Sequence, residues 1–206
     1  MPTVPLGLQS SDRDFESLSV ERLINCYVEQ ASQSATSPVP IVGTPGHVPE
    51  FIVGTGPVRK AIRWGNHRYI VSGDELYKVA NDNTAIKLGS VPGTYRMSMG
   101  ALRAGVVLVS GGKYYHTDGV TLTEQALPDY IPSQPLTPDS LTVINNTVII
   151  GFKDTDYYAW SAPNEPGNFN GIDIATAERK TDETVRVYSD NNELLLFGRE
   201  SLEIKY

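Results

Sequence analysis

The residues best suited to chemistry in this sequence are carboxylates, and two of them stand close together as Asp154 and Asp156. Such a pair is typical of sites for divalent cations, but the glycine and the distal glutamate of a calcium loop are missing. A polar hairpin tip explains the same pair. A glycoside hydrolase would combine one of them with another carboxylate, such as Glu165. Because folding rather than spacing brings such carboxylates together, the sequence leaves this chemistry open.

The other reactive side chains lack suitable neighbours. His47, His67 and His116 have no second ligand at a metal-binding spacing, so we expect no metal site. The single cysteine, Cys26, rules out an intramolecular disulfide and has no basic neighbour that would activate a thiolate. The Gly111-Gly112 pair does not precede a helix and so lacks the dipole that a phosphate-binding loop uses. We therefore expect a protein that is not an enzyme and uses no cofactor.

Composition and charge narrow the function classes further. The chain has 206 residues, of which 40% are hydrophobic and 20% are charged, which is enough to bury a core. No apolar run approaches the roughly 18 residues of a membrane span, and the first residues do not resemble a secretory signal. We expect the protein to be made in a cytoplasm and not to insert into a membrane. The formal net charge of -7 argues against tight nucleic-acid binding, although DNA could still slide past an acidic surface.

The elements that must position these side chains are short strands, which recur as a unit from residue 58 onward. Each unit is a strand, a polar turn, an apolar strand, a glycine and a third strand. The glycines are Gly73, Gly111, Gly151 and Gly198, which stand 38, 40 and 47 residues apart. A repeat of about 40 to 45 residues with three or four strands is typical of a β-propeller blade.

The second strand of each unit supports this interpretation because it is apolar at consecutive positions, as in Val106–Val109, Thr147–Ile150 and Leu194–Phe197. A strand covered on both faces by neighbouring sheets has this pattern, whereas a strand with one face in water alternates. We therefore expect Leu195 to be buried, and aspartate at this position to prevent soluble folding. A β-sandwich is the alternative fold, but it gives no reason for the repeat.

Two further features fit blades. Fourth strands are predicted in the linking stretches, at residues 85–88 and 121–124. The tyrosine pairs Tyr114-Tyr115 and Tyr157-Tyr158 stand in the third strand of successive units. They could form a sugar-binding stripe, but their recurrence in register favours packing between blades.

The N-terminal part of the chain differs from the repeats. Residues 1–57 have no sustained periodicity, and their second half carries proline or glycine every few residues, so we predict an extended arm. Blades are predicted at 58–95, 96–139, 140–180 and 181–206, the last of them incomplete. The expected fold is an all-β propeller of about four blades with an N-terminal arm. Such a ring could close by pairing with the N-terminal arm. Because an unfinished ring exposes sheet edges, we expect instead that these blades are part of a larger ring.

Two stretches of sequence resemble a known family. The first is ERLINCYVE at residues 21–29, followed by VGTPG at 42–46 and by Phe51. The second is DYYAWS at residues 156–161 with PGNF following it, and LLLFGRESLE at 194–203. Both are similar to the packaged DNA stabilization proteins, the tail hub or nozzle of short-tailed bacteriophages. The resemblance spans nearly the whole chain and about the N-terminal half of a typical member.

The resemblance implies a structural protein of the virion tail, assembled in the host cytoplasm. Such a protein forms a ring, expected to be hexameric, below the portal and its adaptor. It carries tail fibre or spike proteins, closes the DNA channel and retains packaged DNA until ejection. The DNA passes without specific binding, which agrees with the negative net charge.

The expected assembly interface lies on the arm, at the motif positions Asn25, Tyr27, Glu29, Thr44, Pro45 and Gly46. The alternative function is a glycan-binding or glycan-cleaving propeller of a tail fibre. A third interpretation, a cellular propeller scaffold, predicts peptide partners on one face of the ring and no assembly into rings.

Overall fold

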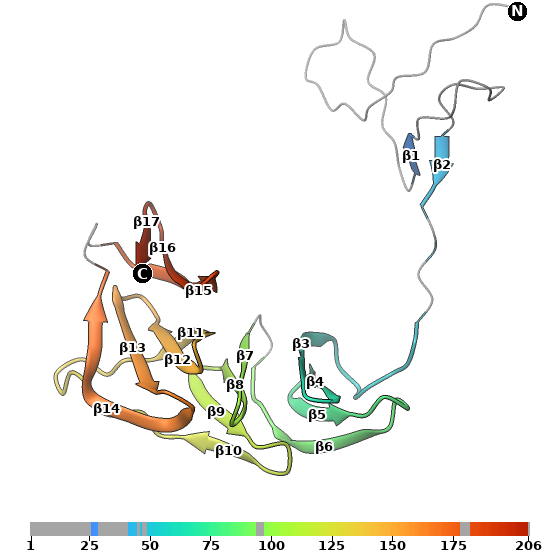
Figure 1. Ribbon diagram of the computed structural model, residues 1–206, viewed down its shortest axis with the longest axis horizontal. Coiled ribbons are helices and arrows are strands. Elements are labelled where there is room, and N and C mark those ends of the chain that lie inside the picture. Colours follow the sequence, from blue (N-terminus) through green and yellow to red (C-terminus); the bar gives the residue numbers. More distant parts are fainter. Residues whose placement is uncertain are drawn as a thin grey trace, which may run out of the picture. The chain divides into compact units, whose positions relative to one another are not determined.

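The structure is a computed structural model, and it describes residues 26–28, 41–44, 46, 49–93, 97–177 and 182–205. The chain divides into two compact units, residues 1–50 and 51–206. In the first unit, β1 (Cys26–Val28) pairs with β2 (Ile41–Gly43) in a two-stranded antiparallel sheet. The second unit contains four larger sheets (Figure 1).

Each of these four sheets is built from consecutive strands. The first sheet contains β3 (Val58–Trp64), β4 (His67–Ser72), β5 (Glu75–Val79) and β6 (Ala85–Ser90). The second contains β7 (Ser98–Leu102), β8 (Gly105–Ser110), β9 (Lys113–Thr117) and β10 (Leu122–Gln125). The third contains β11 (Pro138–Ile144), β12 (Thr147–Phe152), β13 (Tyr157–Ala162) and β14 (Glu165–Thr176). The fourth contains β15 (Thr184–Asp190), β16 (Glu193–Gly198) and β17 (Leu202–Lys205).

The tight turns between strands have the backbone conformation that short hairpins require. Asn145 and Asn146 join β11 to β12 with φ angles of 49° and 60°. Asn191 and Asn192 join β15 to β16 with φ angles of 45° and 67°. Two successive positive φ values match the right-handed twist of the flanking strands, and asparagine tolerates them better than most residues. The sheets are therefore antiparallel meanders whose register is fixed by local turns.

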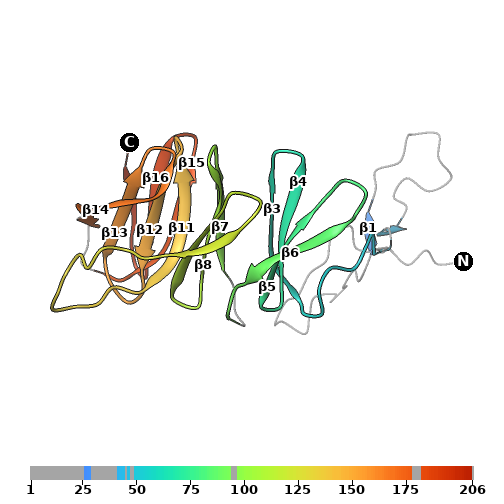
Figure 2. The same cartoon turned by 90° about the horizontal axis from the view of Figure 1, so that it is seen from below.

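The four sheets pack side by side, face against face (Figure 2). Contacts between neighbouring sheets run mainly through the first strands, β3 with β7, β7 with β11 and β11 with β15. The fourth strands β6, β10 and β14 lie on the side of the sheets opposite these first strands (Figure 1). Meanders arranged in this way are the blades of a β-propeller. The predicted all-β propeller is confirmed, and we call the sheets blades one to four.

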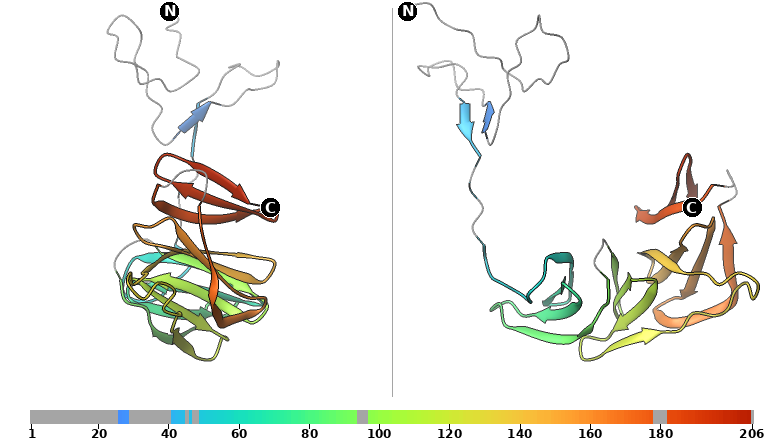
Figure 3. Two further views of the ribbon diagram at one scale, coloured as in Figure 1. Left: turned by 90° about the vertical axis from the view of Figure 1, so that its left-hand side faces the viewer. Right: turned by 180° about the vertical axis from the view of Figure 1, so that it is seen from behind.

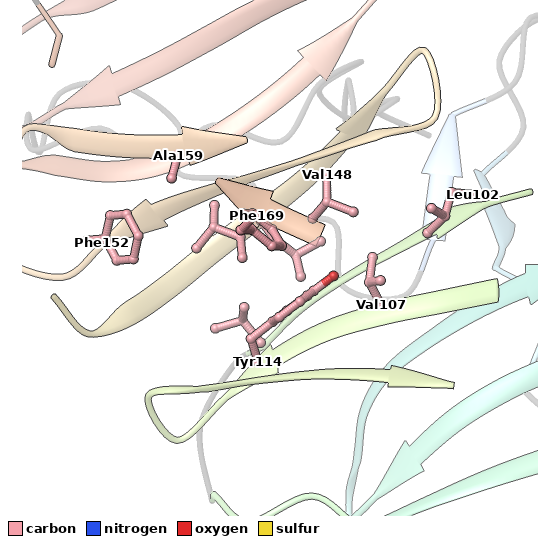
Figure 4. Packing of buried hydrophobic residues seen from close by; sticks show 10 residues of the cluster. Leu102, Val107, Tyr114, Val148, Phe152, Ala159 and Phe169 are labelled. Carbon is pink, nitrogen blue, oxygen red and sulfur yellow. The ribbon is translucent and has the colours of Figure 1, made fainter. Parts of the chain in front are cut away.

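Each blade has two faces, defined here by the chain direction. The forward face looks toward the following blade, and the backward face looks toward the preceding one. A cluster between blades two and three shows how the faces meet: Val107 and Tyr114 on the forward face of blade two pack against Val148, Phe152 and other residues of blade three (Figure 4). Successive strand residues point to opposite faces, so one strand contributes to two clusters.

Glycines allow the blades to approach closely at two interfaces. A Cβ atom on Gly100 of β7 would lie 2.5 Å from Cγ2 of Val143 in the next blade. A Cβ atom on Gly151 of β12 would lie 2.9 Å from Cγ1 of Val187. In both places the aliphatic side chain of the following blade occupies the space that a larger residue would need.

The structure corrects the alignment of the repeat on its glycines. Gly73 and Gly111 follow the second strand and adopt φ angles of 56° and 59° in the turn. Gly151 lies inside β12, and Gly198 is the last residue of β16. Aligned by their first residues, the second strands of the four blades start 38, 42 and 46 residues apart. The sequence did not reveal this because all four glycines follow an apolar run.

The observed strands lie within the four predicted segments, except that β11 begins at Pro138, inside the stretch assigned to blade two. The predicted fourth strands correspond to β6 and β10. The long fourth strand of blade three, Glu165–Thr176, was not predicted, because its sequence is rich in polar residues and glycine. Within the residues that the structure describes, there is no helix long and apolar enough to cross a membrane.

A second correction concerns burial in blade four. Every residue of β8 is buried, whereas in β16 only Leu194 and Leu196 are. Leu195 is only half-buried and Phe197 is 38% exposed, because both side chains point to the forward face, which none of the described sheets covers. The prediction that Leu195 is enclosed on both sides was therefore wrong.

Candidate assembly surfaces

The predicted interface on the arm is described only in part. Tyr27 lies in β1 opposite Val42 of β2, and Thr44 follows β2 directly. Thr44 and Gly46 are exposed. Asn25, Glu29 and Pro45 lie outside the described residues. The pairing of β1 with β2 thus places the two motif stretches of the arm, which are separate in the sequence, next to each other. The role of these residues in assembly remains a prediction.

The side chains considered for metal chemistry do not converge in the described part of the chain. His67 begins β4 opposite Trp64, and His116 in β9 places its Nε2 atom 3.2 Å from the carbonyl oxygen of Ala104. His47 lies outside the described residues. No group of three histidine, cysteine, aspartate or glutamate side chains lies close enough to hold a metal among the residues that were placed.

The carboxylates considered for glycoside hydrolysis lie at opposite ends of one strand. Asp154 and Asp156 belong to the turn before β13, and Glu165 follows the turn after it. Six residues of extended strand span roughly 20 Å, about twice the largest separation that a glycosidase pair uses. Asp154 instead lies near Lys153 and Arg199, and Glu165 accepts a hydrogen bond from Asn168 at 2.5 Å. The fold does not bring Glu165 to the aspartates.

In each of the first two blades, a serine at the end of the second strand makes a hydrogen bond that fastens this strand to the start of the blade. The Ser72 hydroxyl donates to the carbonyl of Gly56 at 2.8 Å, and the Ser110 hydroxyl donates to the carbonyl of Pro92 at 2.7 Å. Each bond ties the second strand to the segment that leads into the first strand of the same blade. The sequence analysis missed this role, although the repeated Val-Ser-Gly triplet was a usable signal.

Arg59 extends this fastening from blade one to blade two. Its guanidinium group donates to the carbonyls of Gly73 at 3.2 Å and Val91 at 3.0 Å, and to the Ser110 hydroxyl at 2.5 Å. Burial lowers the pKa of Arg59, and the nearby Asp74 carboxylate offsets part of this effect. Because one charged group donates to three acceptors in two blades, Arg59 holds blades one and two together near the start of their first strands. Sequence reasoning did not identify it.

Further polar bonds join each pair of neighbouring blades. Lys78 donates to the carbonyl of Gly119 at 3.0 Å between blades one and two. The Tyr114 hydroxyl donates to the carbonyl of Pro166 at 2.7 Å between blades two and three, and this bond is buried. The hydroxyls of Thr142 and Ser189 lie 2.8 Å apart between blades three and four. Burial of Tyr114 raises the pKa of its hydroxyl well above the ordinary value, so it remains a donor.

The buried tyrosines support packing rather than a sugar-binding stripe. Tyr114, Tyr115 and Tyr158 are 1%, 4% and 7% exposed. Tyr114 meets Phe169 of blade three edge to face, with ring centres 5.5 Å apart. A stripe that stacks sugar rings needs open aromatic faces, which these residues do not offer.

A shallow cleft lies between strands β9 and β10 and the linker that leads to blade three. Its volume is about 340 Å³, and its lining includes Lys113, Tyr114, Glu124, Pro128 and Phe152. Lys113 and Glu124 form an ion pair at 2.8 Å, so these two charges largely neutralise each other. Gln125 and Asp129 also line the cleft, so it offers polar as well as apolar surface.

Three solved structures with a similar fold are longer than this chain, which covers 22% to 53% of their length. The extracellular domain of a hybrid two-component system from Bacteroides thetaiotaomicron has a TM-score of 0.56 and 14% identity, covering 78% of this chain and 22% of that one. BamB from Moraxella catarrhalis has a TM-score of 0.56 and 13% identity, with 81% and 50% covered. YCF48, solved with a D1 peptide, has a TM-score of 0.53 and 14% identity, with 80% and 53% covered. The identities are low, so these similarities support the fold alone.

Sequence comparison identifies the family. No curated protein matches the sequence. Residues 18–206, however, match the phage stabilisation family described as "Bacteriophage P22 Gp10, beta-propeller". The match includes both stretches that carry the resemblance and all four blades. This chain therefore belongs to the packaged DNA stabilization family of phage structural proteins, the family of the bacteriophage P22 Gp10 β-propeller.

Proposed function

We propose that this protein is a component of the tail hub of a short-tailed phage, assembled below the portal and its adaptor, where it closes the DNA channel and retains packaged DNA until ejection. The observation that carries the proposal is the family match, which runs from residue 18 to residue 206 and includes most of the arm as well as the blades. In this role the protein acts by assembly, as a ring of identical subunits expected to be hexameric, and has no catalytic function.

The charges and contacts of the chain support this role. A net charge of -7 disfavours adsorption of DNA, which must move through a tail without sticking. The polar side chains highlighted above, Arg59, Ser72, Ser110 and Tyr114, are used in holding blades together. Three described residues are proposed to contact the neighbouring subunits: Tyr27 in β1, and Thr44 and Gly46, which follow β2 and are exposed.

Reconstitution with a purified portal–adaptor complex tests the proposal. We expect the chain to join the complex as a ring, measurable by native mass spectrometry and electron microscopy. Deletion of residues 1–37 should weaken this assembly strongly but lower the melting temperature only slightly. Thr44→Arg should weaken assembly without changing the melting temperature, whereas Thr123→Arg, at an exposed threonine of β10, should leave both unchanged.

Two results would overturn the proposal. One is a chain that folds but does not join the portal–adaptor complex at any concentration. The other is saccharide hydrolysis that disappears in the Asp154→Asn, Asp156→Asn or Glu165→Gln variant, which would favour the tail-fibre glycosidase instead.

A further inference from the structure

The fourth strand of blade three, β14, contains a bulge. Phe169 pairs with Ser161 of β13 and Ile174 pairs with Ala159, so the single residue Trp160 of β13 stands opposite four residues of β14. These four residues, none of which has a partner in the register, are Asn170, Gly171, Ile172 and Asp173. A bulge bends its strand, and β14, drawn in orange, bends along its length (Figure 3). Pairing with β13 therefore does not fix this stretch of backbone.

The first two residues of the bulge form the one Asn-Gly pair in the sequence. Both are exposed, and a Cβ atom on Gly171 would meet nothing closer than Pro128 at 4.0 Å. Because glycine has no side chain, its backbone nitrogen can approach the carboxamide of the preceding asparagine more closely than that of any other residue. The backbone N–H of Ile172 donates to Oδ1 of Asn170 at 3.4 Å, so the carboxamide is turned toward the backbone that follows it. There is room for a ring to form between the two residues.

We propose that Asn170 is a site of spontaneous deamidation in the folded protein. The backbone nitrogen of Gly171 loses its proton and attacks Cγ of Asn170, and the C–N bond of the carboxamide breaks to release ammonia. The product is a succinimide ring. Water then opens the ring at either of its carbonyls, which leaves aspartate or isoaspartate at position 170. The reaction consumes water, releases ammonia and needs no enzyme, oxidant or metal. This inference does not depend on the proposed function.

The fold should tolerate the modified residue. Isoaspartate lengthens the backbone by a methylene group, which would shift the register of a paired strand, but the bulge has no register to keep. The new carboxylate takes the place of an exposed carboxamide and makes the net charge of -7 more negative by one unit. We therefore expect the modified protein to stay folded and to accumulate with age.

A second pair that could form the same ring, Asp118-Gly119, is protected by its contacts. Oδ1 of Asp118 accepts hydrogen bonds from the backbone N–H groups of Thr121 and Val120, each at 2.9 Å, and these bonds lower the pKa of Asp118. An ionised carboxylate resists the attack that a carboxamide undergoes. Gly119 is also buried, and a Cβ atom there would lie 2.6 Å from the Tyr69 hydroxyl oxygen. Asp118 should therefore not isomerise.

Peptide mapping by mass spectrometry tests this inference on the full chain, incubated for days at mildly alkaline pH. We expect Asn170 to be converted before any other asparagine into a mixture of isoaspartate and aspartate, while the melting temperature stays unchanged. Gly171→Val should slow the conversion at least about tenfold, because a branched side chain obstructs the approach of the backbone nitrogen. The control is Asn168→Ser, at an exposed position two residues away, which should leave the rate at position 170 unchanged.

Four results would overturn the inference. If Asn170 stays intact in the folded chain and is converted only after unfolding in urea, the bulge holds the residue too firmly for the attack. Aspartate without isoaspartate would show direct hydrolysis and no ring. An undiminished rate in Gly171→Val would show that the glycine has no part in the reaction. Isoaspartate formed equally fast at position 118 would show that the local contacts do not decide which pair reacts.

Discussion

Blades two and four have similar second strands in different surroundings. β8 reads GVVLVS and β16 reads ELLLFG, and both are apolar at four consecutive positions. β8 is buried on both faces because blades one and three pack against it, whereas β16 is buried only toward blade three. The burial of a strand in this fold is therefore a property of its neighbours as much as of its sequence. Substitutions at equivalent positions should have unequal effects.

The largest difference is expected for a buried charge. Val107→Asp places a carboxylate at a position that is fully buried between two blades, and should cost roughly 4 kcal/mol or more, enough to prevent soluble folding. Leu195→Asp, at the equivalent position of blade four, should yield soluble folded protein because the carboxylate can reach water. Soluble expression and thermal unfolding measure both. Equal loss of folding in the two variants would contradict the comparison.

A smaller effect is expected from steric crowding at an interface. Gly100→Val should destabilise the protein by about 1–3 kcal/mol, because even its Cβ atom would lie 2.5 Å from Val143 of the next blade. Gly171→Val is the control, since a Cβ atom there meets nothing closer than Pro128 at 4.0 Å. Urea denaturation compares the two variants. A Gly100 variant as stable as the control would show that blades two and three separate easily.

Loss of one hydroxyl should have a moderate effect inside the stack and almost none outside it. Tyr114→Phe leaves the Pro166 carbonyl without its donor and should cost about 1–2 kcal/mol. Tyr188→Phe makes the same change on the open face and should alter the free energy of unfolding by less than about 0.5 kcal/mol. The free energies come from urea denaturation at pH 7. Identical values for both variants would refute a role for the buried bond.

The smallest effect is expected in alkaline solution. Burial raises the pKa of Tyr114 above its ordinary value of 10.0, so the folded state keeps a proton that the unfolded state loses. This contribution to stability is fully present below pH 10 and falls as the pH rises further. The slope of stability against pH above 10 should therefore be shallower in Tyr114→Phe than in Tyr188→Phe. Parallel slopes would show that Tyr114 ionises as freely as an exposed tyrosine.

Much of the fold could be predicted from the sequence because the signals are local. Turn residues such as Asn145-Asn146 and the apolar runs between them predict strand, turn and repeat. The sequence could not tell Gly111, in a turn, from Gly151, inside a strand, because both follow an apolar run and only the pairing of Gly151 with Ser140 of β11 separates them. It could not predict the exposure of Leu195 either, since that exposure depends on whether another sheet packs on this face of blade four.

The candidate sites were harder to predict for the same reason. The two aspartates at 154 and 156 and Glu165 are close in sequence, but a strand of six residues separates them in space. Arg59 belongs to a basic stretch with no motif, yet it reaches Ser110, which is 51 residues away along the chain. Contacts between blades carry these roles, and the spacing of residues along the chain does not encode them directly.

The order of strands has a consequence for how such a protein emerges from the ribosome. Each strand of a blade pairs with the strand made just before it, and the serine fastenings of the first two blades span only 16 and 18 residues. Synthesis can therefore complete each blade before the next one exists, in keeping with the rapid folding of local contacts. The newest blade then exposes its forward face until its successor is made. Val107 and Val109 pass through that stage during translation, and they are as vulnerable to aggregation in that interval as Leu195 and Phe197 are in the structure described here.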